Sequence, residues 1–185
     1  MTSTNGLVHF VSALLVAGCA LTGRTPEAAT ANPPTRAIDE IRVNLGLPEL
    51  PLEFIEITGM LNSPDVDLQV ALYTDVEGRR YSLDPRANQV VEIDARSTLS
   101  SIPLDRPALA QADLRAIAKR MVETTTPDFA ARAPSLVYEE GNKGDQYFFT
   151  WTNDTQATVH MRPFAQIGMH VTGELFAYYN TLSLK

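Results

Sequence analysis

The sequence predicts an α+β fold in which helices pack on an antiparallel β-sheet. One amphipathic helix is predicted over 107–124, where apolar side chains recur at helical spacing, at Leu114, Ile117, Ala118, Met121 and Val122. Most other segments are short, rich in β-branched and aromatic residues, and bounded by Gly, Pro, Asn or Asp, as strands are. A hydrophobic content of 44% is sufficient for a buried core.

The region 35–106 is predicted to form a first α+β unit. It begins with a helix over 35–45 that Gly46 ends. Strands are predicted to follow over 52–61, 68–74, 80–84 and 89–94. A hairpin turn joins the last two strands, and Asn88 is the residue of that turn best able to adopt a positive φ. An irregular connector is predicted over 97–106.

The region 107–185 is predicted to form a second α+β unit. Its helix is expected to start with Pro107 in the first turn, and Asp105 is a candidate cap. Strands are predicted over 135–139, 146–152, 158–162, 166–171 and 174–179. The segment 140–145 is expected to be a polar loop, and Thr172-Gly173 to turn the last pair of strands.

The order of a helix followed by strands occurs twice, which suggests two tandem helix-plus-sheet units. The two candidate closing hairpins, 81–91 and 167–175, resemble the closing hairpin of PepSY-like domains, as does a helix followed by an aromatic strand. The sequence departs from that family at His170, where Asp is usual, and at Asn88, where Gly is usual. The resemblance implies a helix on an antiparallel sheet in secreted or membrane-tethered bacterial proteins, a family proposed to restrain peptidases by binding them.

The N-terminus is predicted to be a lipoprotein signal peptide over residues 1–18. Its apolar run of about twelve residues is too short to span a membrane, and it ends in Val16-Ala17-Gly18-Cys19, which resembles the bacterial lipobox. The resemblance implies lipidation of Cys19 and a membrane-anchored, extracytoplasmic location in the cell envelope. The absence of Lys and Arg from the first eighteen residues departs from the usual signal. Ordinary secretion, or a buried apolar segment with a free cysteine, are the alternatives.

Residues 19–34 are predicted to be a flexible tether, because they are rich in Ala, Thr and Pro and nearly without large apolar residues. The chain has a net charge of −7, and the region 35–106 carries most of it, with thirteen Asp and Glu against seven Lys and Arg. An acidic chain without a basic cluster is a poor nucleic-acid binder. Contact with the membrane is therefore expected through the lipid on Cys19.

No residue pattern predicts a metal site or a cofactor. His160 and His170 are the only histidines beyond the signal, and a zinc site requires three or four ligands. The segment with Asn62, Asp65 and Asp67 lacks the Gly and the terminal Glu of a calcium loop. Ordinary strand histidines and a polar turn are the preferred interpretations.

No residue pattern predicts catalysis either. Glu139, Glu140 and Asp145 are candidates for paired carboxylates, but a solvated loop is the preferred interpretation. No serine lies in a strand-turn-helix nucleophile motif. The chain is therefore predicted not to be an enzyme.

Aromatic residues gather in the predicted C-terminal strands. Tyr147, Phe149 and Trp151 share one face of their strand, and Tyr178 lies on the last strand. These four residues are a candidate binding face for a peptide or an apolar ligand. Core packing against the 107–124 helix is the preferred interpretation of these aromatic residues.

The predicted function is that of a membrane-tethered lipoprotein that binds a protein or peptide through its aromatic face or a sheet edge. A module that restrains a peptidase is one form of this function. The alternatives are a carrier of a small apolar ligand, with a cavity between helix and sheet, and a hydrolase, which requires convergent titratable groups in a cleft.

Overall fold

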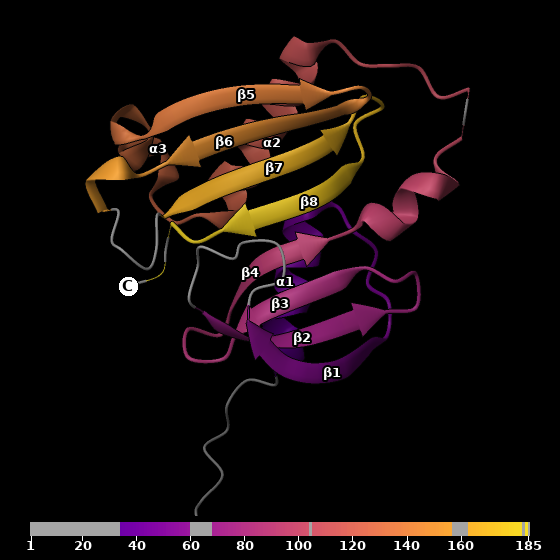
Figure 1. The fold of residues 1–185 in the computed structure, drawn as a ribbon, viewed down its shortest axis with the longest axis vertical. Helices are drawn as coiled ribbons and strands as arrows, with labels where there is room; N and C mark the ends of the chain where they lie inside the picture. The colour runs from indigo at the N-terminus through magenta and orange to yellow at the C-terminus, as the bar shows by residue number, and fades with distance from the viewer. Residues whose placement is uncertain (1–33, 60–67, 104, 157–162, 183, 185) are drawn as a thin grey trace, which may run out of the picture. The chain divides into compact units, whose positions relative to one another are not determined.

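The secondary structure consists of two long helices, each followed by four strands (Figure 1). The computed structural model describes residues 34–59, 68–103, 105–156, 163–182 and 184. The first set is α1 (Pro34–Leu45), β1 (Leu52–Gly59), β2 (Gln69–Asp75), β3 (Arg80–Asp84) and β4 (Gln89–Asp94). The second set is α2 (Gln111–Thr125), β5 (Val137–Lys143), β6 (Gln146–Thr152), β7 (Phe164–His170) and β8 (Leu175–Asn180). The short helices are η1 (Arg96–Ser101), α3 (Phe129–Arg132), η2 (Ala133–Ser135) and η3 (Asp154–Gln156).

The eight strands form one sheet in the order β1-β2-β3-β4-β8-β7-β6-β5, and every neighbouring pair is antiparallel. Each set of four strands is a meander, and the two meanders join where β4 pairs with β8. Among the strands that the structure describes, β1 and β5 are the two edges of the sheet. The prediction of an α+β fold with helices and an antiparallel sheet is confirmed.

The main core is one cluster of buried side chains from the long helices and the strands. In α1 the buried residues Ile38, Ile41 and Leu45 recur at the spacing that the sequence predicts, and α2 buries Leu114, Ala118 and Val122. These side chains form one cluster with the inward-facing side chains of the sheet. A smaller apolar cluster, with Val70, Val91, Phe176 and Tyr179 among its members, lies apart from it.

Helix α1 ends in a Schellman motif. Gly46 adopts φ +68, the Gly46 amide donates to the Val43 carbonyl at 3.2 Å, and the Leu47 amide donates to the Arg42 carbonyl at 2.8 Å. Leu47 then packs against the core. The predicted end of this helix at Gly46 is confirmed, and the motif directs the chain toward β1.

A buried ionic group joins α1 to β2 and β3. The guanidinium of Arg42 lies 4.6 Å from the centre of the Tyr81 ring and 3.7 Å from Asp75 Oδ2, and it donates to the Leu50 carbonyl at 2.8 Å. Asp75 also accepts hydrogen bonds from the Tyr81 hydroxyl and the Arg79 amide, both at 3.0 Å. Burial raises the pKa of Tyr81 to about 12, so this hydroxyl stays protonated and donates. The group fixes α1 on the sheet.

The predicted start of the second helix at Pro107 is wrong, because α2 begins at Gln111. The preceding segment pairs with the β7–β8 hairpin instead: the Leu109 amide donates to the Val171 carbonyl at 2.8 Å, and Arg106 forms an ion pair with Glu174. This hydrogen bond and this ion pair tie the segment before α2 to the hairpin in a non-helical conformation, and Asp105 caps no helix.

The prediction of a polar loop over 140–145 is also wrong in part. Strand β5 continues to Lys143 in register with β6, and the turn is limited to Gly144, at φ +62, and Asp145. Cross-strand hydrogen bonds to an aromatic neighbour outweigh the polar composition of this segment. The connector predicted over 97–106 contains η1. The strand predicted over 158–162 lies outside the described residues.

Candidate functional site

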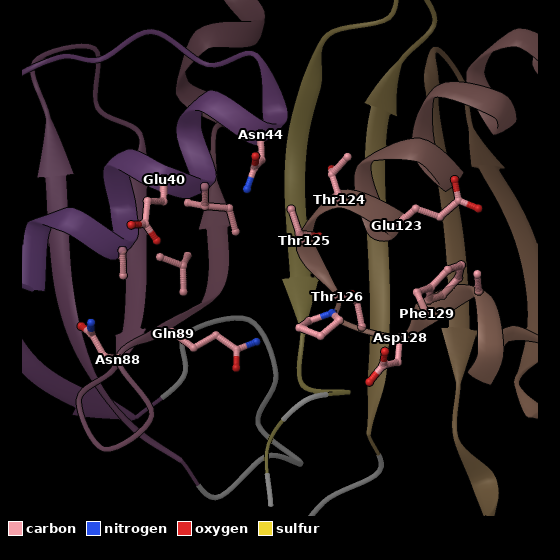
Figure 2. Close-up of a pocket in the computed structure, with 15 residues that line it drawn as sticks. Glu40, Asn44, Asn88, Gln89, Glu123, Thr124, Thr125, Thr126, Asp128 and Phe129 are labelled. Carbon is pink, nitrogen blue, oxygen red and sulfur yellow. The ribbon is translucent and has the colours of Figure 1, made fainter.

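A cleft of about 460 Å³ lies between α1, the β3–β4 turn and the segment that joins α2 to α3 (Figure 2). Its apolar wall is made by Ala37, Ile41, Val90, Pro127, Phe129 and Ala130. Its polar wall is made by Glu40, Asn44, Asn88, Gln89, Glu123, Thr124, Thr125, Thr126 and Asp128. Residues from both sets of elements therefore line the cleft. No local sequence pattern in either set predicts it.

Two residues of the cleft have left-handed backbone conformations. Asn88 adopts φ +49 in the β3–β4 turn, as the sequence predicts, and Asp128 adopts φ +58 directly before α3. Among the described residues they are the only positions other than glycine with a positive φ. Asn and Asp tolerate this conformation better than other side chains do. Both turns are therefore compatible with their residues, and they bring two polar side chains to the same cleft.

Some polar side chains of the cleft already form hydrogen bonds within the protein, and others do not. The hydroxyls of Thr124 and Thr125 donate to the Met121 carbonyl at 2.9 and 2.8 Å, and the Thr126 hydroxyl accepts from the Asn180 amide at 2.8 Å. Three of the amide side chains that line the cleft, those of Asn44, Asn88 and Gln89, have no hydrogen-bond partner among the described residues. Figure 2 shows Asn44 and Gln89 extending toward the space beside Thr125 and Thr126.

The available groups define what the cleft can accept. Side-chain amides both donate and accept hydrogen bonds, so they can bind main-chain amides and other neutral polar groups. The carboxylates of Glu40 and Glu123 already pair with Arg36 and Lys119. No group of three or more metal-binding side chains occurs in the described ranges. The cleft therefore offers hydrogen-bonding side chains beside an apolar wall.

The second candidate surface is the edge strand β1. Large apolar side chains are exposed along it, with exposed fractions of 52% for Phe54, 46% for Ile55 and 62% for Ile57. At the other edge, Val137 and Tyr138 of β5 are less exposed, at 43% and 40%. An exposed edge strand presents unpaired backbone groups beside its side chains. Strand β1 therefore has the features of a surface that receives another strand.

The predicted aromatic binding face lies in the core of the molecule. Phe149, Trp151 and Tyr178 are buried, and Tyr147 is partly buried against the same cluster. The Trp151 ring packs 5.6 Å from Phe129 and 5.1 Å from Tyr138. Burial raises the pKa of Tyr178 to about 12. These positions correspond to the interpretation of core packing, because Phe149, Trp151 and Tyr178 belong to the same buried cluster as Leu114 and Val122 of α2.

The carboxylate candidates do not form a pair. Glu139 and Glu140 are neighbours on β5, so their side chains point to opposite faces. Glu140 forms an ion pair with Arg115 and accepts hydrogen bonds from the Tyr138 hydroxyl and from Gln111 Nε2, the latter at 2.7 Å. The hydrogen bond from Arg115 lowers the pKa of Glu140 to about 2. Glu140 thus anchors β5 to α2.

His170 lies at the end of β7, beside the β7–β8 turn. Its Nδ1 is 2.6 Å from the Thr172 hydroxyl, which donates a hydrogen bond to Glu174, the partner of Arg106. None of the three residues His170, Thr172 and Glu174 lines the cleft. Their hydrogen bonds close the hairpin turn, in which Gly173 adopts φ +95.

Besides the strand over 158–162 and the signal peptide over 1–18, further sequence predictions lie outside the described residues. They concern the lipidation of Cys19, the role of His160, and the polar turn with Asn62, Asp65 and Asp67. None of the helices in the described ranges has the length and apolar character needed to cross a membrane.

The sequence predicted a sheet edge as a binding surface but did not identify β1 as that edge, and it did not predict the cleft. The segment Leu52-Glu53-Phe54-Ile55-Glu56-Ile57 mixes apolar and acidic residues, and this was the available signal of an edge strand. No comparable sequence pattern indicates the cleft. Comparisons with protein-family models, with curated proteins and with solved structures found no match to this chain.

Proposed function

We propose that this chain is a membrane-tethered, non-enzymatic lipoprotein of the cell envelope that binds a protein or peptide. The lipobox-like Val16-Ala17-Gly18-Cys19 supports the anchor, and the composition of 19–34 supports a tether that holds the folded region away from the membrane. A diacylated cysteine with a further acyl chain provides more than the single chain that anchors only marginally.

The observation that carries the binding function is the exposed edge strand β1. Its eight residues run along one end of the sheet, and five consecutive side chains, Glu53 to Ile57, are exposed. Protein domains that bind extended peptides add the peptide as a further strand at such an edge. The sheet edge is one of the two surfaces predicted from the sequence, and the aromatic face is buried.

The order of elements supports a tandem arrangement of two PepSY-like units, 35–106 and 107–185. Each range has a long helix followed by a meander of four strands, and the last strands of the two meanders pair with each other. In this proposal each long helix packs on its own meander. A unit of this kind that restrains a peptidase would do so by binding a segment of the peptidase.

Photo-crosslinking in intact cells tests the binding function. A photoreactive amino acid at Ile57 is expected to give a discrete crosslinked protein, whereas the same residue at Val76, in the turn after β2, is expected to give only background. Both positions are well exposed, so accessibility does not distinguish them. Equal background at the two positions would contradict the proposal.

Incorporation of labelled palmitate tests the anchor. Wild-type protein is expected to carry the label, and the variant Cys19→Ser is expected to carry none, because the thiol is the acylated group. Label on both proteins, or on neither, would contradict the lipoprotein assignment and leave the binding test unaffected.

A further inference from the structure

We infer that β1 accepts a partner strand in which Lys or Arg alternates with apolar residues, and that this strand extends the sheet as a ninth strand. The inference rests on the proposed binding function and names the chemistry of its partner. It is drawn from three features of β1: the free edge, the apolar side chains on one face and the carboxylates on the other.

The free edge of β1 supplies the backbone groups. Within the described residues β1 is the first strand in the sheet order and pairs with β2 alone. Every other residue of an edge strand points its N–H and C=O groups away from its neighbour. The pairing with β2 runs from Leu52 to Gly59, with a bulge between Phe54 and Glu56. A strand of this length offers a partner several main-chain hydrogen bonds.

The apolar face of β1 lies on the side of the sheet that carries the helices. Phe54 pairs with Tyr73 and Ile57 pairs with Ala71, and both of these β2 residues belong to the main core. The ring of Phe54 meets that of Tyr73 edge to face, with centres 5.5 Å apart. Helix α1 packs on β3 and β4. Phe54 and Ile57 therefore continue the core surface outward and remain half exposed or more.

The opposite face of β1 is acidic. Glu53 pairs with Thr74 and Glu56 pairs with Leu72, so the two carboxylates share the face away from the helices. Neither carboxylate forms an ion pair with any residue that the structure describes. Opposite charges on directly paired strands attract, and like charges repel. A partner strand with basic residues on this face, and apolar residues on the other, matches β1 on both faces.

A second copy of the chain does not match β1. Two antiparallel β1 strands related by a twofold axis would place Glu53 and Glu56 of both copies on the same face, where like charges repel. The other edge of the sheet is less suited to a basic strand. On β5, Glu140 is already paired with Arg115, and Tyr138 packs against Trp151.

Binding of synthetic peptides to the purified protein tests the inference. The first peptide alternates Val and Lys over eight residues, the second alternates Val and Glu, and the third has the composition of the first with its four Lys grouped together. Fluorescence anisotropy is expected to show about tenfold tighter binding of the Val-Lys peptide than of either other peptide, with a preference that declines as salt screens the charges.

Reversing the charges of Glu53 and Glu56 tests whether the peptide binds at the β1 edge. The double variant Glu53→Lys/Glu56→Lys is expected to reverse the preference, so that the Val-Glu peptide binds more tightly than the Val-Lys peptide. The matched control Glu139→Lys/Asp145→Lys makes the same change in net charge among exposed residues at the β5 edge, and it is expected to keep the wild-type preference. Hydrogen exchange of the amides in 52–59 is expected to slow on binding, and exchange in 137–143 to stay unchanged.

Three results would overturn the inference. They are equal binding of the alternating and the grouped Lys peptides, an unchanged preference in the Glu53→Lys/Glu56→Lys variant, and protection of 137–143 in place of 52–59. The cellular crosslink at Ile57 is measured separately. A crosslink that persists in the charge-reversed variant retains the proposed binding function and rejects the basic partner strand, whereas absence of any crosslink rejects the binding function itself.

Discussion

Gly168 in β7 has a packing role that its local sequence does not show. A Cβ placed at this position would lie 2.7 Å from Phe176 Cε2 and 3.0 Å from the Ala177 Cβ. Both contacts are shorter than van der Waals separation, and Phe176 belongs to the smaller apolar cluster. The close approach occurs beside the bulge in the β7–β8 pairing. Only glycine therefore allows the ring of Phe176 to occupy its place.

We predict that Gly168→Ala lowers the free energy of unfolding by about 1–3 kcal/mol, because the added methyl group must displace the Phe176 ring or the backbone. Urea denaturation measures this change. Gly141→Ala is the matched control, since Gly141 also lies in a strand and a Cβ there meets no atom within 4 Å. A loss of stability in the control equal to that of Gly168→Ala would show that packing is not the cause.

At the scale of elements, the contact between β5 and α2 depends on one carboxylate. Glu140 is bound by Arg115 and Gln111 of α2 and by Tyr138 of its own strand. These interactions hold an edge strand whose other side chains are mainly exposed. They also explain why β5 continues through a segment that its composition predicts to be a loop.

We predict that the stability difference between wild type and Glu140→Gln depends on pH. The folded-state pKa of Glu140 is lowered from 4.5 to about 2, chiefly by Arg115, so the stabilisation is fully present above pH 4.5. It is lost as the pH falls from 4.5 toward 2, where the carboxyl takes up a proton in both states. Thermal unfolding across this range measures the difference.

The control for this prediction is Glu139→Gln on the same strand. Glu139 is exposed and forms no ion pair with the described residues, so its substitution is expected to leave stability nearly constant across the same pH range. A difference between wild type and Glu140→Gln that does not change between pH 7 and pH 2 would contradict an electrostatic anchor.

At the scale of the folded region, the two meanders share one core. Their strands join through three residue pairs between β4 and β8, and α1 contacts α2. The main core cluster contains residues from both sets, among them Ile38 and Tyr81 from the first and Leu114 and Trp151 from the second. Neither set closes its apolar face independently of the other in this arrangement.

We predict that the folded region unfolds in a single cooperative transition. Trp151, the only tryptophan of the chain, reports on the second meander, whereas circular dichroism in the far ultraviolet reports on all strands and helices. The two signals are expected to give the same midpoint in urea. Separate midpoints would show that the meanders unfold independently and that the shared core contributes little to cooperativity.

Prediction from sequence was most accurate where local chemistry decides the structure. The helix that ends at Gly46, the hairpin with Asn88 and the strand over 146–152 follow from capping, turn residues and alternation. It was less accurate at Pro107, where hydrogen bonds to the β7–β8 hairpin override the helical pattern, and over 140–143, where pairing with β6 overrides a polar composition.

For the candidate sites too, some features follow from local sequence and others depend on tertiary contacts. Local sequence was enough to predict the class of fold, the period of the buried helix faces and the left-handed turn at Asn88, because each depends on residues close together in the chain. The three-dimensional structure was needed to show that Phe149, Trp151 and Tyr178 are core residues and that β1 is an edge strand. The physical reason is that alternation shows which side chains share a face, whereas burial depends on which strand or helix lies beside that face.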